Sequence, residues 1–114
     1  MTLEIVTYYR NKYGAVRCEF NGHKFDSKKE RDRYIVLESM VASGHIKGLE
    51  LHPRFDLMVN GHKIGRYTAD FRYTNSDGGI VVEDVKSKAT KTRDYILRKK
   101  ILATYDPPIN ITET

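Results

Sequence analysis

Three charged side chains in the second half of the chain have types and a spacing that suit metal-assisted phosphate chemistry. Asp84 and Lys86 stand two residues apart in a strand-like run over 80–86, so their side chains share one face. Asp70 lies in the preceding run, and a hairpin closed through the loop at 75–79 places it directly opposite Asp84, with Thr68 opposite Lys86. Opposed Cβ atoms lie about 4.5–5.5 Å apart. Two carboxylates that close repel each other unless a proton or a cation lies between them.

Oxygen ligands at this spacing suit Mg²⁺, with Mn²⁺ as a substitute. A lysine on the same face could orient a water molecule or stabilise charge that develops on a phosphate. The pairing depends on the register, because a slip of one residue would place Asp84 diagonally to Asp70. Without a metal, Asp84 and Lys86 would form ordinary surface salt bridges. Glu83 is the alternative acid on this strand, but its side chain should face away from Asp70.

Glu30 is a further acidic candidate, in the first turn of a helix predicted from Ser27 to about Ser43. The stretch Ser27-Lys28-Lys29-Glu30 is typical of a capping box, and Gly44 suits the end of the helix. Glu30 also lies at the N-terminal end of an apolar stripe formed by Tyr34, Leu37 and Val41. It could therefore cap the helix or complete a metal site, and the pattern leaves both roles open.

Positive charge is concentrated in residues 86–100, which hold seven basic side chains and one acidic one. A localised basic segment is the electrostatic feature expected of a protein that binds a polyanion. The alternative is the solvated face of a helix. The candidate nucleic-acid contacts in this segment are Lys88, Lys91, Arg93, Lys99 and Lys100.

The elements that must position these residues follow from turn pairs and apolar runs. Asn21-Gly22 predicts an N-terminal β-hairpin over 16–25. Strands are predicted over 49–59, 63–74 and 80–86, a second helix over 92–105 and a final strand over 109–111. The first 14 residues show no period and are interpreted as an arm before a single domain over 15–114. The order after the hairpin is one helix, three strands, one helix and one strand, which indicates an α/β fold.

Composition excludes several classes of protein. A chain of 114 residues with a net charge of +5 is long enough for one domain and one core. No apolar run approaches about 18 residues and no secretory signal is visible, so we expect a cytoplasmic protein without a membrane span. The single cysteine, Cys18, fits a reducing compartment. The histidines and Cys18 lack zinc-ligand spacing. The sequence contains no Gly-rich phosphate-binding loop, so we expect no nucleotide cofactor.

Two motifs together resemble a known superfamily. Tyr67-Thr68-Ala69-Asp70-Phe71, followed by Val81-Val82-Glu83-Asp84-Val85-Lys86, resembles the PD-(D/E)xK nuclease pattern, in particular its phage junction-resolving endonuclease I branch. A small phage and prophage family within these nucleases is also similar to the chain over about residues 12–111. The stretches that carry this second resemblance are 12–15, 25–30, 49–51 and 82–86.

The resemblance implies a restriction-endonuclease-like αβββαβ core, a mixed sheet flanked by helices. It implies that Asp70, Asp84 and Glu30 are metal ligands, with the backbone carbonyl of Val85 completing the site, and that Lys86 positions water or stabilises charge. The chain departs from the pattern in two places. Ala69 replaces a proline that is not a ligand, and Asp84 stands where the closest resolvases have the longer glutamate, which could shift the metal preference.

The function implied is that of a Mg²⁺-dependent endonuclease acting on branched DNA such as Holliday junctions. Resolution of a junction needs two cuts, so a homodimer is expected, in the host cytoplasm if the protein is phage-encoded. Two alternatives stay open. A nicking or restriction-like nuclease on linear duplex DNA would use the same residues, and a non-catalytic nucleic-acid-binding module would use only the basic segment.

Overall fold

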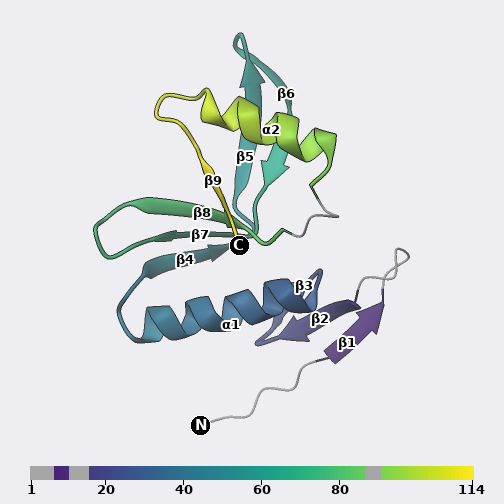
Figure 1. Ribbon diagram of the computed structural model, residues 1–114, viewed down its shortest axis with the longest axis vertical. Coiled ribbons are helices and arrows are strands. Elements are labelled where there is room, and N and C mark those ends of the chain that lie inside the picture. The colour runs from purple at the N-terminus through teal and green to yellow at the C-terminus, as the bar shows by residue number, and fades with distance from the viewer. Residues whose placement is uncertain (1–6, 11–15, 87–90) are drawn as a thin grey trace.

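A four-stranded mixed sheet forms the centre of the protein. The computed structural model describes residues 7–10, 16–86 and 91–114, and Figure 1 shows their arrangement. The strand order in the sheet is β4-β7-β8-β9. β4 and β8 both run antiparallel to β7, and β9 runs parallel to β8. The bounds of these strands are β4 (Lys47–Leu51), β7 (Phe71–Thr74), β8 (Ile80–Asp84) and β9 (Ile111–Glu113).

Helix α1 (Lys28–Ala42) packs through Tyr34 and Leu37 into one of the two buried clusters, together with Phe71 of β7. Its start follows the predicted cap, because Ser27 Oγ accepts a hydrogen bond from the Glu30 N–H at 3.1 Å. The predicted apolar stripe is wrong at its last member, since Val41 is exposed. The chain turns back after α1 and brings Ile46 into the core beside Met40, which leaves Val41 outside.

The predicted N-terminal hairpin is confirmed as β2 (Val16–Phe20) and β3 (His23–Phe25), with Asn21 and Gly22 both at positive φ in the turn. A strand that the sequence does not predict, β1 (Thr7–Arg10), pairs antiparallel with β2. It lies within the segment interpreted as an arm. The resulting three-stranded sheet contacts α1.

A second hairpin, β5 (Arg54–Val59) and β6 (His62–Thr68), forms its own two-stranded sheet. Helix α2 (Arg93–Ala103) lies across this hairpin in Figure 1 and packs Tyr95 and Leu102 against Leu57, Tyr67 and Val82. The mixed α/β class is thus confirmed. Neither helix in the described ranges has the length and apolar character needed to cross a membrane.

Two of the predicted strands are each broken in two, so five strands rather than three lie between the helices. The run over 49–59 breaks at His52, which has a left-handed φ of 53°, and at Pro53. The run over 63–74 breaks at Ala69 and Asp70, and the breaks face each other through hydrogen bonds of 3.0 Å from the His52 N–H to the Asp70 carbonyl and from the Ala69 N–H to the Pro53 carbonyl.

The β5–β6 hairpin therefore leaves the central sheet at these breaks. Thr68 pairs with Arg54, and the predicted pairing of Thr68 with Lys86 is wrong. The C-terminal elements are also displaced from their predicted bounds, since β9 begins at Ile111 rather than at residue 109. Without the inserted hairpin, the chain order is α1, β4, β7, β8, α2, β9.

Candidate active site

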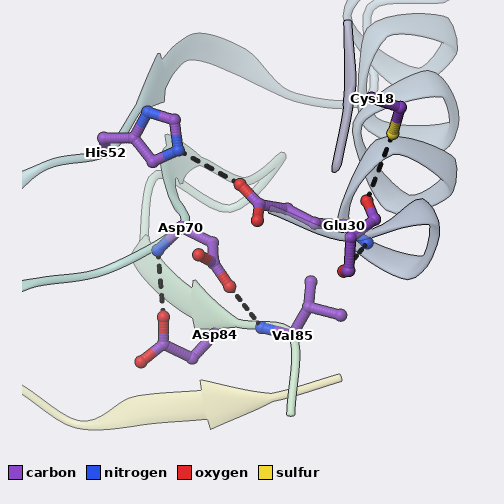
Figure 2. A network of polar contacts seen from close by, with 7 residues as sticks. Cys18, Glu30, His52, Asp70, Asp84 and Val85 are labelled. Atoms are coloured by element: carbon purple, nitrogen blue, oxygen red, sulfur yellow. Dashed lines mark hydrogen bonds and ion pairs between the residues drawn. The ribbon is translucent and has the colours of Figure 1, made fainter. Parts of the chain in front are cut away.

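Asp70 lies between the end of β6 and the start of β7, and Asp84 is the last residue of β8. The two aspartates meet at this point. The pairing of β7 with β8 has the predicted register, with Phe71 opposite Glu83, which brings the two aspartates together. The Asp70 N–H donates a hydrogen bond to Asp84 Oδ1 at 3.0 Å, and the Val85 N–H donates one to Asp70 Oδ2 at 2.7 Å. Figure 2 shows this cross-link between the two segments. Both carboxylates are thus held in place by backbone donors.

Burial changes the acidity of both groups. It raises the pKa of Asp70 to about 6, with a further contribution from the negative charge of Glu30. It also raises the pKa of Asp84 to about 6, and only 2% of this residue is exposed. The positive charge of Lys86 opposes the rise in the pKa of both aspartates. At neutral pH the site therefore holds ionised carboxylates at a cost in stability, which a bound cation would offset.

We expect Asp70→Asn to stabilise the metal-free protein at pH 8 by about 1–3 kcal/mol, because one pKa unit corresponds to about 1.4 kcal/mol. The folded-state pKa lies above the unfolded value, so the stability that protonation contributes is present below about pH 4 and lost as the pH rises through about 6. The gain from Asn should shrink towards zero at pH 4. Urea unfolding in EDTA at both pH values measures it, with the exposed Asp56→Asn as control. An equal gain at both pH values would contradict the assigned cause.

Glu30 reaches from α1 into the same region. It is only 4% exposed, and its Oε1 lies 3.1 Å from His52 Nε2. The described cap of α1 is made by the Ser27 hydroxyl, while the Glu30 carboxylate contacts His52 and raises the pKa of Asp70. In Figure 2 the side chains of Glu30, His52, Asp70 and Asp84 gather from four segments of the chain. Helix capping alone therefore does not explain where the Glu30 carboxylate lies.

His52 is the residue at this site that sequence reasoning missed, because its spacing to other histidines suggested no ligand role. Its hydrogen bond with Glu30 is the main cause that raises the pKa of its imidazole, and Asp70 contributes. The signal in the sequence is the His52-Pro53 pair inside an otherwise strand-like run. This pair ends β4 and turns the imidazole towards Glu30.

Lys86 also belongs to the site, because its charge acts on the pKa of both aspartates. Its Nζ lies 4.5 Å from the centre of the Tyr95 ring, a cation–π contact. Its backbone is held by bonds between its N–H and the Thr114 carbonyl at 3.1 Å and between its carbonyl and Lys29 Nζ at 2.8 Å. Val85 contributes its N–H to the described contacts, so the role of its carbonyl as a ligand stays a prediction.

Glu83 points to the other face of β8, as the alternation of side chains predicts. It is 1% exposed and accepts two hydrogen bonds from the Arg33 guanidinium, each of 2.8 Å. The Tyr73 hydroxyl donates a further hydrogen bond to it. The hydrogen bonds with Glu83 raise the pKa of Arg33. Burial, together with the Glu83 carboxylate, raises the pKa of Tyr73 to about 12. Glu83 thus joins α1 to β8 behind the aspartates.

The donor set at the aspartates fits a hard divalent cation. In the described ranges, no three His, Cys, Asp or Glu side chains are grouped closely enough to hold a metal ion by themselves. Mg²⁺ does not require such a group, because it is commonly held by one or two carboxylates and keeps several waters. The hydrogen bonds described above occupy Oδ2 of Asp70 and Oδ1 of Asp84. The other oxygen of each carboxylate has no hydrogen bond among the described residues and is available as a ligand atom.

The predicted basic segment is divided in the structure. Lys88 lies outside the described residues. Lys91 and Lys99 contact Glu113 at 3.6 and 3.4 Å, while Arg93 and Lys100 are exposed at the ends of α2. These cations therefore do not form one uncompensated stripe, which weakens the argument for DNA binding at Lys91 and Lys99.

Comparison with known proteins relates the chain to a protein family. Neither the curated proteins nor the solved structures contain a significant match. A family model does match, over residues 10–112, and it is described as a protein of unknown function, DUF1064. Since this match covers most of the chain, the protein belongs to the DUF1064 family.

Proposed function

We propose that this protein is a metal-dependent DNA endonuclease of the PD-(D/E)xK type. The observation that carries the proposal is the pair of half-buried Asp70 and buried Asp84, joined by hydrogen bonds from the Asp70 N–H to Asp84 and from the Val85 N–H to Asp70. Two ionised carboxylates at this spacing gain from a cation between them. Glu30 and Lys86 supply the further acid and the cation that phosphodiester hydrolysis would use at the same point.

The arrangement of the elements supports the same proposal. The order α1, β4, β7, β8, α2, β9 corresponds to the αβββαβ order of a restriction-endonuclease-like core, with the β5–β6 hairpin as an insertion. The strands of the central sheet are partly antiparallel and partly parallel, as such a mixed sheet requires. Asp70 and Asp84 stand at the strand ends that the resemblance assigns to the metal ligands.

Each residue would have a distinct task. Asp70 and Asp84 would hold Mg²⁺ through the carboxylate oxygens that the described hydrogen bonds leave available. The bound cation would lower the pKa of the attacking water and offset the charge on the scissile phosphate. Lys86 would stabilise negative charge on the phosphate oxygens, with its ammonium group held near the Tyr95 ring. Glu30 would contribute a further acidic group from α1 and is oriented by His52.

The substrate follows from the resemblance, and branched DNA is the leading candidate, with a homodimer making two cuts. The test incubates the protein with a labelled four-way junction and a linear duplex of matched sequence, each with Mg²⁺ and with EDTA. We expect Mg²⁺-dependent cleavage of the junction. Cleavage of both substrates alike would favour a restriction-like or nicking nuclease. Binding of DNA without cleavage under any metal condition would favour a non-catalytic module.

Glu30→Gln should separate the two roles of this residue. If Glu30 is an acid of the metal site, its replacement by Gln should lower the cleavage rate by about 10²-fold or more, comparable to the loss of one electrostatic stabiliser. Because Ser27 supplies the described cap of α1, the free energy of unfolding should fall by about 1 kcal/mol or less. The cleavage rate and the melting temperature of the same variant decide the matter. A fully active variant would leave Glu30 with a structural role.

A further inference from the structure

A polar pocket of about 260 Å³ lies beside the candidate active site, between β6, the end of β8 and the start of α2. Asp84 and Lys86 are part of its lining, so the pocket is continuous with the site. In Figure 1, β6 and α2 lie next to each other above the end of β8. The remaining lining residues are Arg66, Tyr67, Thr68, Thr92, Asp94, Tyr95 and Arg98.

Cations from three segments meet in this pocket. Arg66 comes from β6, Arg98 from α2 and Lys86 from the segment after β8. The Arg66 guanidinium forms no ion pair within the described ranges and is exposed. Arg98 donates a hydrogen bond to the Arg66 carbonyl at 3.3 Å and pairs with Asp94 at 3.0 Å. The two arginines thus lie on neighbouring elements, and Asp94 offsets part of the charge of one of them.

Neutral donors line the same pocket. Thr68 and Thr92 contribute hydroxyl groups, and Thr92 is also the residue that caps the N-terminus of the 11-residue helix α2. That end of a helix favours negative charge. Tyr67 is 4% exposed, and its hydroxyl is buried without a hydrogen-bond partner among the described residues. A buried hydroxyl normally has a partner, so this one is consistent with a ligand oxygen that accepts a hydrogen bond from it.

We propose that this pocket binds a phosphate group of the DNA backbone, next to the phosphate that is cleaved. The proposal rests on the proposed nuclease function and names a second point of contact with the substrate. Arginine suits this task, because its planar guanidinium can donate two parallel hydrogen bonds to a phosphate. Arg66 and Arg98 therefore replace Lys91 and Lys99 as the principal phosphate contacts, since both lysines contact Glu113.

The test measures the salt dependence of binding of duplex and junction DNA in EDTA, where cleavage does not interfere. Each phosphate contact contributes about 0.9 to the slope of log K against log salt, so loss of this one contact in Arg66→Gln with Arg98→Gln should reduce the slope by about 1. The matched control is Lys47→Gln with Lys63→Gln, which removes the same charge from residues that do not line the pocket. The control should leave the slope nearly unchanged. Equal slopes in the wild type and the pocket variant would overturn the proposal.

Asp94→Asn provides a test in the opposite direction. It frees Arg98 from its ion pair and should tighten DNA binding several-fold in EDTA. The gain should be smaller when Arg98 is already glutamine, because the ion pair no longer exists to be released. Weaker or unchanged binding by Asp94→Asn would contradict the proposal even if the double arginine variant failed to fold.

The subsite and the nuclease function can fail separately. If the wild type cleaves DNA but the slope does not depend on Arg66 and Arg98, the subsite is wrong and the nuclease proposal stands. If the slope depends on both arginines but no metal supports cleavage, the pocket binds phosphate and the nuclease proposal fails.

Discussion

Asp70→Asn and Asp84→Asn are each expected to lower the rate of Mg²⁺-dependent DNA cleavage by about 10³-fold or more, the upper end of what loss of one electrostatic stabiliser costs. Each change removes the charge that would hold the cation and keeps the size of the side chain. An amide oxygen can still accept the bond that each aspartate receives, from the Val85 N–H or the Asp70 N–H. Affinity for DNA in EDTA should be equal or higher, because one repulsion against phosphate is removed. Single-turnover rates and binding isotherms for the same variants measure both quantities.

Glu83→Gln serves as the comparison for these two variants, assayed well below its melting temperature. Glu83 faces Arg33 on the other side of β8, so the cleavage rate of the Glu83→Gln variant should differ little from that of the wild type. If Glu83→Gln lost activity while Asp84→Asn remained active, the acid of the site would be Glu83. Cleavage near the wild-type rate by either aspartate variant would show that the metal site is misplaced.

Glu83→Gln is also expected to have the largest effect on stability, lowering the free energy of unfolding by about 2–4 kcal/mol. Removing one partner of a buried ion pair typically costs about 3–5 kcal/mol, and the amide oxygen of Gln retains part of the bonding. Glu83 is 1% exposed and bonds both Arg33 and Tyr73, so the change removes the charge that pairs with Arg33 and weakens the hydrogen bonding of both partners. Urea unfolding at pH 7 measures the change.

The control for this prediction is Glu50→Gln. Glu50 pairs with Arg72 on the surface, where the two side chains are 47% and 37% exposed. Exposed ion pairs contribute about 0–1 kcal/mol, so the control should lose no more than that. A loss of the same size in both variants would mean that the Arg33–Glu83 pair does not fasten α1 to β8.

Features that depend on neighbouring residues could be predicted from the sequence. Ser27 caps α1 as its side-chain chemistry requires. The Asn21-Gly22 pair, and the Asn60-Gly61 pair between β5 and β6, adopt the positive φ values of tight hairpin turns. The register of β7 and β8 followed from the length of one loop, and that register brings Asp70 to Asp84. Two hairpins, both helices and the aspartate pair were accessible for this reason.

Features that depend on contacts between distant segments could not be predicted. The breaks at His52 and at Asp70 stabilise each other through two hydrogen bonds between residues that are 18 and 16 positions apart in the chain. Either run, read alone, alternates like a continuous strand. Because of these breaks Thr68 pairs with Arg54 instead of Lys86, and His52 reaches Glu30; the sequence predicts neither contact.

The sequence by itself thus determined the local elements and the acidic pair, because caps, turns and alternation act over a few residues. Tertiary structure decided which charges are compensated and which are available. It buried Glu83 against Arg33, paired Lys91 and Lys99 with Glu113, and left Arg66 unpaired within the described ranges. A charge in the sequence has no fixed partner until packing brings distant segments within a few ångströms, where Coulomb energies exceed thermal energy.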